Sequence, residues 1–284
     1  MIFEHEIPQD SKLYFGRSAS IKRKIENICA TTLHNIGFEE IVTPIFSYHQ
    51  HLSFEDERYL LHLHDADNET ITLRADSTAD VVRIVTKRLG RTTGYKKWFY
   101  IQPSLIYPTK EQYQVGAEII GGDFSEVVDT ATLLIKELKL KGILQVSNMR
   151  IPTLLNRRYG VDLELLYETN IEKILAIGLD WIERLIKIHR VEDLEDLSIF
   201  PDDIRDELIL IRDSILDIDY PDIVVAPLYY AKLRYYDSLV FKIFYGNEPL
   251  ARGGLYSIGD VNASGFALYV DSCINQKIDK VKDE

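Results

Sequence analysis

Several features that are common in proteins of this size are scarce in this chain of 284 residues. Cys29 and Cys273 are its two cysteines, too few for a disulfide framework, and they indicate a reducing compartment, the cytoplasm. No apolar run approaches the roughly 20 residues that span a bilayer, and the polar N-terminus is unlike a signal peptide. We therefore expect a cytoplasmic protein with no membrane partner.

Positive charge is also in short supply. The sequence has 33 lysines and arginines against 45 aspartates and glutamates, which gives a net charge of −12. Proteins bind nucleic acids largely by neutralising phosphates, so we expect no nucleic-acid partner. The hydrophobic share of 46% is ordinary and predicts a well-packed globular core.

The motifs of common enzyme classes are missing as well. The sequence has no phosphate-binding Walker loop, no dinucleotide fingerprint, no nucleophile elbow and no cysteine-based zinc signature. His62 and His64 would share one side of a strand, where two rings can reach one ion, but no third ligand stands nearby. We therefore expect neither a metal nor a cofactor.

The first half of the chain mixes helices with strands. Apolar residues recur at helical spacing over residues 17–36. The β-branched residues 41–43 predict a strand, and Pro44 indicates that this strand lies at the edge of a sheet or ends there. Turn-forming residues between apolar runs predict two hairpins, which turn at residues 65–69 and 108–110.

Capping residues predict two further helices in this half. One begins at Thr78, with Ser77 or Thr78 as its cap, and the other is capped by Ser125.

Composition divides the chain into three parts. Residues 153–220 are rich in leucine, isoleucine and charged residues at helical spacing, which predicts a helical insertion. Strand patterns occupy residues 1–152 and 221–284 on either side, the two parts of one core. Because neighbouring strands pair in hairpins, we expect an α+β fold with a mainly antiparallel sheet flanked by helices.

Some polar residues stand in segments that should be buried. Gln114 and Glu118 are four apart in one strand with Gly116 between them, so they share one side of the sheet. An unpaired buried polar group costs about 1–3 kcal/mol, so such residues need partners. They form either an inert network or a pocket for a small zwitterion, and their spacing does not decide between the two. The other members of the set are Asp76, Tyr235, Tyr236 and Arg252.

Four stretches, in this order, resemble the catalytic core of class II histidyl-tRNA synthetases. GFEEIVTPIF resembles motif 1, and LRADSTADVVRIV resembles the family's Leu-Arg-Pro-Glu-Gly-Thr segment. YQVGAEIIGG resembles the strand that closes motif 2. RYYDSLVF with LARGGLYS resembles the paired-tyrosine and Ala-Gly-Gly-Arg-Tyr-Asp segments.

This resemblance implies a set of roles. Pro44 becomes the motif 1 proline of a dimer interface. The candidates for a histidine pocket become Asp76, Thr78, Gln114, Glu118, Tyr235 and Tyr236.

The residues that activate an amino acid in those synthetases are not conserved here. Ile106 stands where motif 2 has its arginine, and Ala231 stands where the histidine-specific arginine is expected. The motif 3 arginine is missing beside Asp271 and Ser272. Losing one preorganised donor of this kind costs about 10²–10³ in rate, so losing three should abolish adenylate formation. We also expect no anticodon-binding domain after this core.

A synthetase core without these residues is similar to the regulatory subunit of ATP phosphoribosyltransferase. The resemblance implies a non-catalytic subunit that activates a short-form catalytic subunit in the first step of histidine biosynthesis and takes part in histidine feedback. The expected partners are that catalytic subunit, a second copy of this chain, and histidine. Two alternatives stay open, a free-standing class II amino-acid-activating ligase and a scaffold with a collapsed pocket.

Overall fold

A computed structural model describes residues 6–50, 57–90, 92–231 and 236–279. Its centre is an eight-stranded sheet, antiparallel except for the parallel pair at each edge. Across the sheet the strands run β1 (Glu39–Glu40), β5 (Lys97–Ile106), β6 (Lys110–Ile120), β11 (Val261–Tyr269), β10 (Glu248–Ile258), β9 (Tyr236–Tyr245), β7 (Ile143–Asn148) and β8 (Ile223–Val225).

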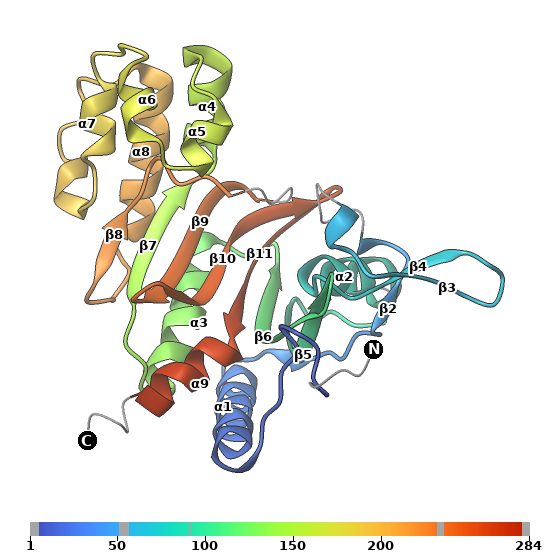
Figure 1. Ribbon diagram of the computed structural model, residues 1–284. Helices are drawn as coiled ribbons and strands as arrows, with labels where there is room; N and C mark the ends of the chain where they lie inside the picture. Colours follow the sequence, from blue (N-terminus) through green and yellow to red (C-terminus); the bar gives the residue numbers. More distant parts are fainter. Residues whose placement is uncertain (1–5, 51–56, 91, 232–235, 280–284) are drawn as a thin grey trace.

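One side of this sheet is apolar and covered by three helices, α1 (Gly16–Asn35), α3 (Phe124–Glu137) and α9 (Val270–Asp279), which contact one another and the strands (Figure 1). Alternation along each strand produces this side. On β6, for example, Val115, Ala117 and Ile119 belong to the main core, whereas Glu118 points the other way. The helices therefore leave the opposite, polar side of the sheet available for a site.

Part of that polar side is covered by a small second unit (Figure 1). It is a three-stranded sheet in the order β2 (Phe46–Ser47), β4 (Thr70–Leu73) and β3 (His62–His64). The short helix η2 (Glu57–Tyr59) lies between β2 and β3 in the chain. α2 (Thr78–Ile84) follows β4 and is continued by the wider turns of η3 (Val85–Leu89).

The helical insertion lies beyond the β7–β8 edge (Figure 1). Its core includes Trp181, whose ring packs edge-on against Tyr159 at 4.9 Å and Phe200 at 6.2 Å. α8 contacts both β7 and α3, which ties the insertion to the sheet. Its helices are α4 (Arg150–Tyr159), α5 (Leu163–Tyr167), α6 (Ile171–Leu175), α7 (Ile182–Ile186), η4 (Val191–Leu194) and α8 (Asp202–Ile215).

The structure confirms both predicted hairpins and the first predicted helix. β3 pairs with β4 around residues 65–69, and β5 pairs with β6 across ten residue pairs around residues 108–110. Cys29 and Cys273 are buried free thiols. Within the described ranges, no helix is both long and apolar enough to cross a membrane.

One of the predicted helix caps is wrong, and the other is confirmed in position but not in its hydrogen bond. Asp123, not Ser125, caps α3, because its carboxylate accepts from the Glu126 backbone N–H at 2.8 Å. Ser77 stands at the N-cap position of α2, which begins at Thr78 as predicted, but its side chain makes no capping hydrogen bond. The Ser77 hydroxyl accepts from Gln102 instead, and the Asp76 carboxylate accepts from the Ala79 N–H at 3.1 Å.

The strand predicted at residues 41–43 is also wrong. The strand at this sheet edge, as predicted an edge strand, is β1 at Glu39–Glu40, and the Ile41 N–H still donates to the Phe99 carbonyl at 2.8 Å before the chain leaves the ladder. Side chains from distant elements bind the backbone there. The Thr43 N–H donates to the Gln102 side chain at 3.2 Å, and the Thr43 and Pro44 carbonyls accept from Arg74.

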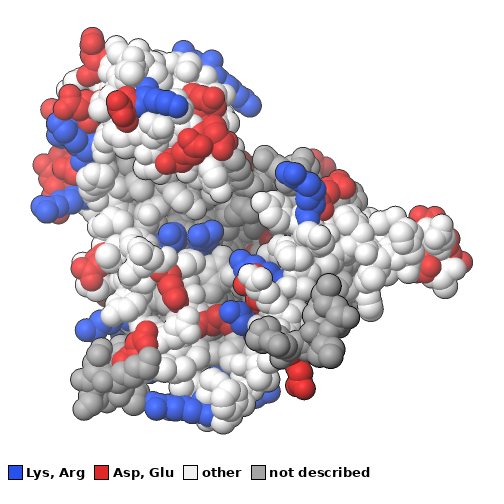
Figure 2. Space-filling view, in the orientation of Figure 1, with Lys and Arg blue, Asp and Glu red and all other residues white. Residues whose placement is uncertain are grey.

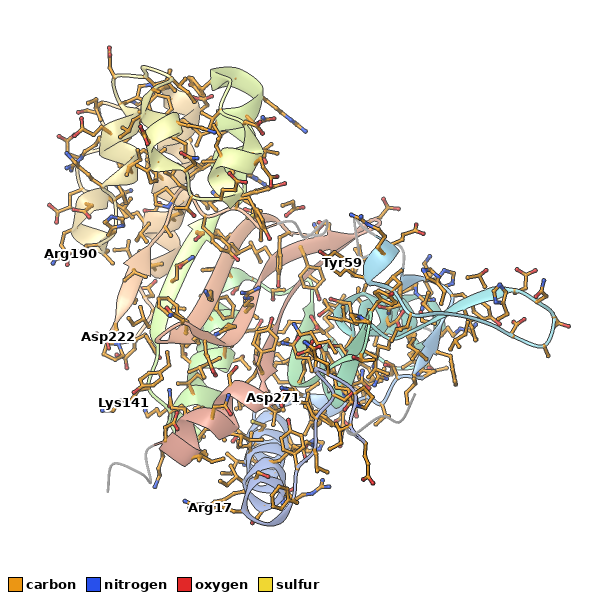
Figure 3. The ribbon with its side chains drawn as sticks, viewed as in Figure 1. Arg17, Tyr59, Lys141, Arg190, Asp222 and Asp271 are labelled. Carbon is orange, nitrogen blue, oxygen red and sulfur yellow. The ribbon has the colours of Figure 1, made fainter. Side chains whose placement is uncertain are left out.

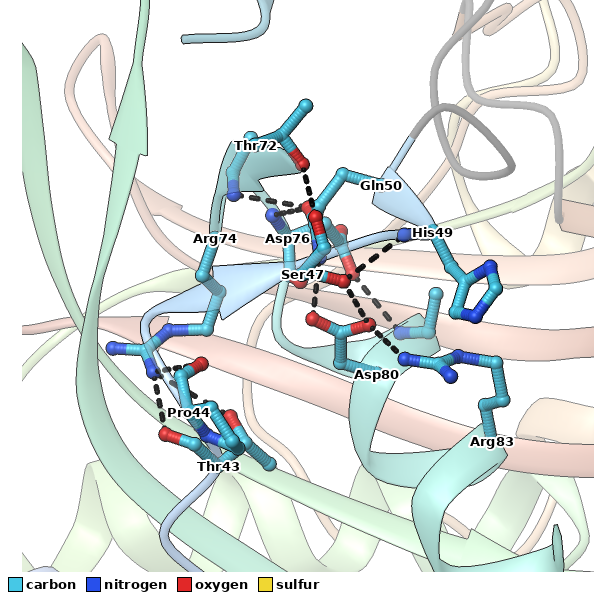
Figure 4. A network of polar contacts seen from close by, with 12 residues as sticks. Thr43, Pro44, Ser47, His49, Gln50, Thr72, Arg74, Asp76, Asp80 and Arg83 are labelled. Carbon is cyan, nitrogen blue, oxygen red and sulfur yellow. Dashed lines mark hydrogen bonds and ion pairs between the residues drawn. The ribbon is translucent and has the colours of Figure 1, made fainter. Parts of the chain in front are cut away.

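Arg74 holds this region together (Figure 4). Its side chain is 2% exposed, and Nη1 donates to the carbonyls of Thr43 at 2.9 Å and Pro44 at 3.1 Å. Nε and Nη2 donate to the Pro103 carbonyl at 3.1 and 2.9 Å. Burial lowers the pKa of Arg74. The guanidinium therefore joins the motif 1 segment to β5 through backbone acceptors.

We predict that Arg74→Lys destabilises the fold by about 2 kcal/mol or more, because an ammonium lacks the planar fork that reaches three carbonyls and would leave buried acceptors unpaired. Urea unfolding of the variant and the wild type measures this difference. Arg157→Lys, at an exposed position of α4, is the matched control and should leave stability unchanged. Equal stability of both variants would contradict the assigned role.

Candidate functional site

A buried carboxyl group lies at the centre of the polar side of the sheet. The Glu118 side chain on β6 is 0% exposed. The Thr78 hydroxyl donates to its Oε1 at 2.8 Å, and the Tyr256 hydroxyl donates to its Oε2 at 2.5 Å. The Glu118 centre, defined as Glu118 with Thr78 and Tyr256, thus joins three elements, β6, α2 and β10.

Glycines make room for this centre. A Cβ at Gly265, which lies opposite Glu118 on β11, would come within 1.8 Å of Glu118 Oε2. A Cβ at Gly116 would come within 2.0 Å of the Tyr100 ring. The fully buried Tyr100 ring crosses over Gly116, and its hydroxyl adjoins Thr78 and Glu118. Small residues at these two positions are therefore a steric requirement of the site.

Burial decides the charge of Glu118. Removal from water raises its pKa to about 8, and the nearby charge of Asp76 acts in the same direction. The hydrogen bonds from Tyr256 and Thr78 lower the pKa but do not offset burial. At neutral pH the carboxyl is therefore mostly protonated, and a cationic or hydrogen-donating ligand would favour its ionised form.

Tyrosines surround the Glu118 centre. The Tyr236 ring on β9 packs edge-on against Tyr256 at 6.3 Å between centroids. Burial raises the pKa values of Tyr236, Tyr256 and Tyr269, so all three carry neutral hydroxyls. These tyrosines are amphipathic: their aromatic rings can contact an apolar group of a ligand, and their hydroxyls can bond a polar one.

A polar network fixes the start of α2, which carries Thr78 (Figure 4). Gln50 is its hub: Oε1 accepts from the backbone N–H groups of Ala75 at 2.9 Å and Asp76 at 2.7 Å. Gln50 Nε2 donates to the Asp80 carboxylate at 2.6 Å. Asp80 also accepts from Ser47 at 3.0 Å and pairs with Arg83 at 2.9 Å. This network holds the helix end against the sheet.

The structure brings most of the predicted pocket residues together. Thr78, Glu118 and Tyr236 meet at one place, and Asp76 is close enough for its charge to act on Glu118 and Tyr236. Gln114 lies further along β6, where its amide donates to Ser104 and Gln112. Tyr235 lies outside the described residues.

Three tyrosines of the site were missed by sequence reasoning. Tyr100 lies opposite Gly116 on β5, which the hairpin register could have revealed. Tyr256 and Tyr269 come from β10 and β11, and their approach to β6 depends on strand order, which no local pattern encodes.

The positions where synthetase cations are expected lie on several elements of the core. Ile106 is the last residue of β5. Asp271 and Ser272 open α9, where Figure 3 labels Asp271 near the junction with β11. Burial raises the pKa of Asp271. Ala231 lines a cavity of about 890 Å³ beneath the helical insertion, together with Arg252.

The predicted pair His62 and His64 lies on β3 with both side chains exposed. Among the residues that the structure describes, no three histidine, cysteine or carboxylate side chains are grouped as metal ligands would be.

We predict that Glu118 makes stability depend on pH. Its folded pKa of about 8 lies above the ordinary 4.5, so its contribution is fully present below about pH 4.5 and is lost as the pH rises through about 8. Glu118→Gln cannot ionise and removes this dependence.

Urea unfolding of both proteins from about pH 5 to about pH 8 measures the effect. The stability of the wild type should fall relative to Glu118→Gln, by on the order of a few kcal/mol. Glu168→Gln, at an exposed position in the insertion, is the control and should follow the wild type. A constant difference between wild type and Glu118→Gln would contradict the shifted pKa.

The sequence and the fold are both similar to those of known proteins. The family profile of histidyl-tRNA synthetases matches residues 16–174. A solved structure described as an ATP phosphoribosyltransferase regulatory subunit/histidyl-tRNA synthetase from Bacillus halodurans superposes with a TM-score of 0.83 at 20% identity, over 97% of this chain and 84% of that one. A histidine–tRNA ligase subunit from Alicyclobacillus acidocaldarius gives a TM-score of 0.81 at 20% identity over 100% of both chains.

Two curated relatives are more similar in sequence. The ATP phosphoribosyltransferase regulatory subunit of Wolinella succinogenes is 43% identical over 278 residues, which cover 97% of each chain. That of Helicobacter hepaticus is 38% identical over 276 residues, or 96% of this chain and 98% of the relative. With its synthetase-like fold and this similarity along nearly its whole length, the chain belongs to the family of ATP phosphoribosyltransferase regulatory subunits.

Proposed function

We propose that this protein is a non-catalytic subunit that activates a short-form ATP phosphoribosyltransferase and makes that enzyme sensitive to histidine. One contrast carries the proposal. The Glu118 centre offers an intact set of groups for a small polar ligand, whereas Ile106, Ala231 and the Asp271–Ser272 step supply no cation for adenylate formation.

The chemistry of the Glu118 centre supports histidine as its ligand. An imidazole ring can donate to a carboxyl oxygen and pack against the rings of Tyr100 and Tyr236. The amino group would find the Asp76 carboxylate nearby, since the charge of Asp76 acts on Glu118. We therefore assign histidine recognition to these residues and the regulatory output to the partner enzyme.

An exposed apolar face near Pro44 supports self-association. Val42 is 77% exposed and Phe46 is 59% exposed, and Ile45 and Tyr48 are exposed beside them. Large side chains grouped in this way on a surface are typical of an interface. We propose that this motif 1 face joins two copies of the chain and that the catalytic subunits bind to the dimer.

We predict that the purified protein raises the turnover of a short-form ATP phosphoribosyltransferase and that histidine suppresses the activated complex. Glu118→Gln should still activate but need about tenfold more histidine, because an amide cannot pair as an anion with a cationic ligand. Steady-state rates against histidine concentration measure both effects, with Glu168→Gln as the control. The proposal fails if the protein changes neither turnover nor histidine sensitivity.

We predict that Phe46→Glu converts the dimer to a monomer, because a buried unpaired charge at an interface is costly. Light scattering coupled to size-exclusion chromatography gives the mass directly. Phe15→Glu changes a side chain of similar exposure, 75%, outside this face and should remain dimeric. A wild-type protein that is already monomeric would refute the proposed interface.

We predict only background exchange of pyrophosphate into ATP in the presence of histidine. The motif positions at Ile106, Ala231 and Ser272 cannot neutralise phosphate charge, and preorganised cations supply much of the rate in such reactions. Exchange above background with any amino acid would favour the alternative of a free-standing ligase.

A further inference from the structure

Two cations lie side by side on the polar side of the sheet. Arg252 on β10 is directly opposite Lys242 on β9, and Lys242 is directly opposite Gln145 on β7. Paired residues of neighbouring strands point to the same side of a sheet, so the three side chains form a row across it. Arg252 precedes Gly254 by two residues, and Gly254 pairs with Gly265, the partner of Glu118. The row is therefore on the same side as the Glu118 centre.

The cavity of about 890 Å³ adjoins the two ends of this row, and Lys242 between them is not one of its lining residues. Arg252 and Gln145, the two ends of the row, both line it, and apolar side chains of the insertion, among them Leu166, Ile174 and Ile186, form its far wall. Figure 2 shows this region as a hollow between the insertion and the rest of the molecule, with lysine or arginine atoms inside it. The cavity combines a cationic floor with an apolar wall.

Arg252 and Lys242 repel each other across the two strands. Like charges directly opposite each other on neighbouring strands are destabilising. Among the described residues, neither Arg252 nor Lys242 forms an ion pair, and the buried Nε of Arg252 has no hydrogen-bond partner. Burial and the adjacent Arg252 lower the pKa of Lys242. A bound anion would relieve both the repulsion and the unpaired donor.

We propose that this cavity binds a small anionic molecule, a carboxylate or phosphate joined to an apolar or aromatic body. The Arg252 guanidinium binds the anionic group through paired N–H donors, and Lys242 adds a second positive charge. The body packs against the wall formed by the insertion and against Tyr229 and Tyr230, which also line the cavity.

This site goes beyond the proposed function, because it requires neither the catalytic partner nor the Glu118 centre. It also differs from the expected synthetase pattern. Ala231, where that pattern has an arginine, lines the same cavity, but the cation here comes from β10 at Arg252. The proposed anion site therefore lies between the insertion and the sheet and depends on Arg252, not on the arginine that synthetases have at position 231.

Calorimetry with matched pairs of probes tests the proposal on the full-length protein. AMP is compared with adenosine, and phenylacetate with phenylacetamide, so that each pair differs only in its anionic group. We expect the anion of at least one pair to bind about tenfold or more tightly than its neutral partner. The pair that responds distinguishes a phosphate from a carboxylate ligand.

Variants identify the residues responsible. Arg252→Gln and Lys242→Gln should each weaken anion binding about tenfold, whereas Lys136→Gln, on the exposed side of α3, should leave it unchanged. Lys242→Gln should also raise the melting temperature without ligand, since it removes one of two like charges, and this measurement reports that the variant is folded. Equal binding of charged and neutral probes, no binding of either anion, or wild-type affinity in Lys242→Gln would overturn the proposal.

Discussion

A carboxyl group that is cut off from water must be neutral or fully paired, and in this protein that constraint falls on Glu118. Its oxygens accept from Thr78 and Tyr256, which brings the start of α2 and the strand β10 onto β6. Gly116 and Gly265 provide the space. Since its pKa lies near 8, the centre is held by neutral hydrogen bonds yet can respond to a cationic ligand. The contacts of Arg74 and Gln50 then hold the segment around Thr43 and the residues before α2 in place beside the Glu118 centre.

The polar side of the sheet divides into two regions of opposite character. Around Glu118 it offers acceptors and neutral hydroxyls, and around Arg252 and Lys242 it offers positive charge under the helical insertion. In a family whose members resemble a synthetase but are named regulatory subunits, such a surface suits recognition of small molecules. The chain as a whole is acidic, yet Arg252 and Lys242 lie side by side and, among the described residues, form no ion pair with a carboxylate.

Local patterns predicted the elements whose structure depends on local chemistry. Both hairpins were correct because turn residues and strand alternation act over a few positions, and the first helix was correct because its apolar spacing is local. The strand at residues 41–43 failed because Arg74 and Gln102, which are distant in sequence, bind the backbone of Thr43 and Pro44. The α3 cap failed because the Asp123 carboxylate takes that place. Ser77 stands at the start of α2 without capping it, since its hydroxyl bonds Gln102 instead.

The sequence by itself determined that Gln114 and Glu118 share one side of a strand, and that a helix begins at Thr78, just after Asp76. It also determined the fold family, through four motifs in a fixed order. Only the tertiary structure decided that Tyr256 bonds Glu118, that Gln114 turns to Ser104, and that Arg252 meets Lys242. The physical reason is that alternation along a strand is a property of neighbouring residues, whereas the partners across a sheet follow from strand order and register, which the whole chain sets.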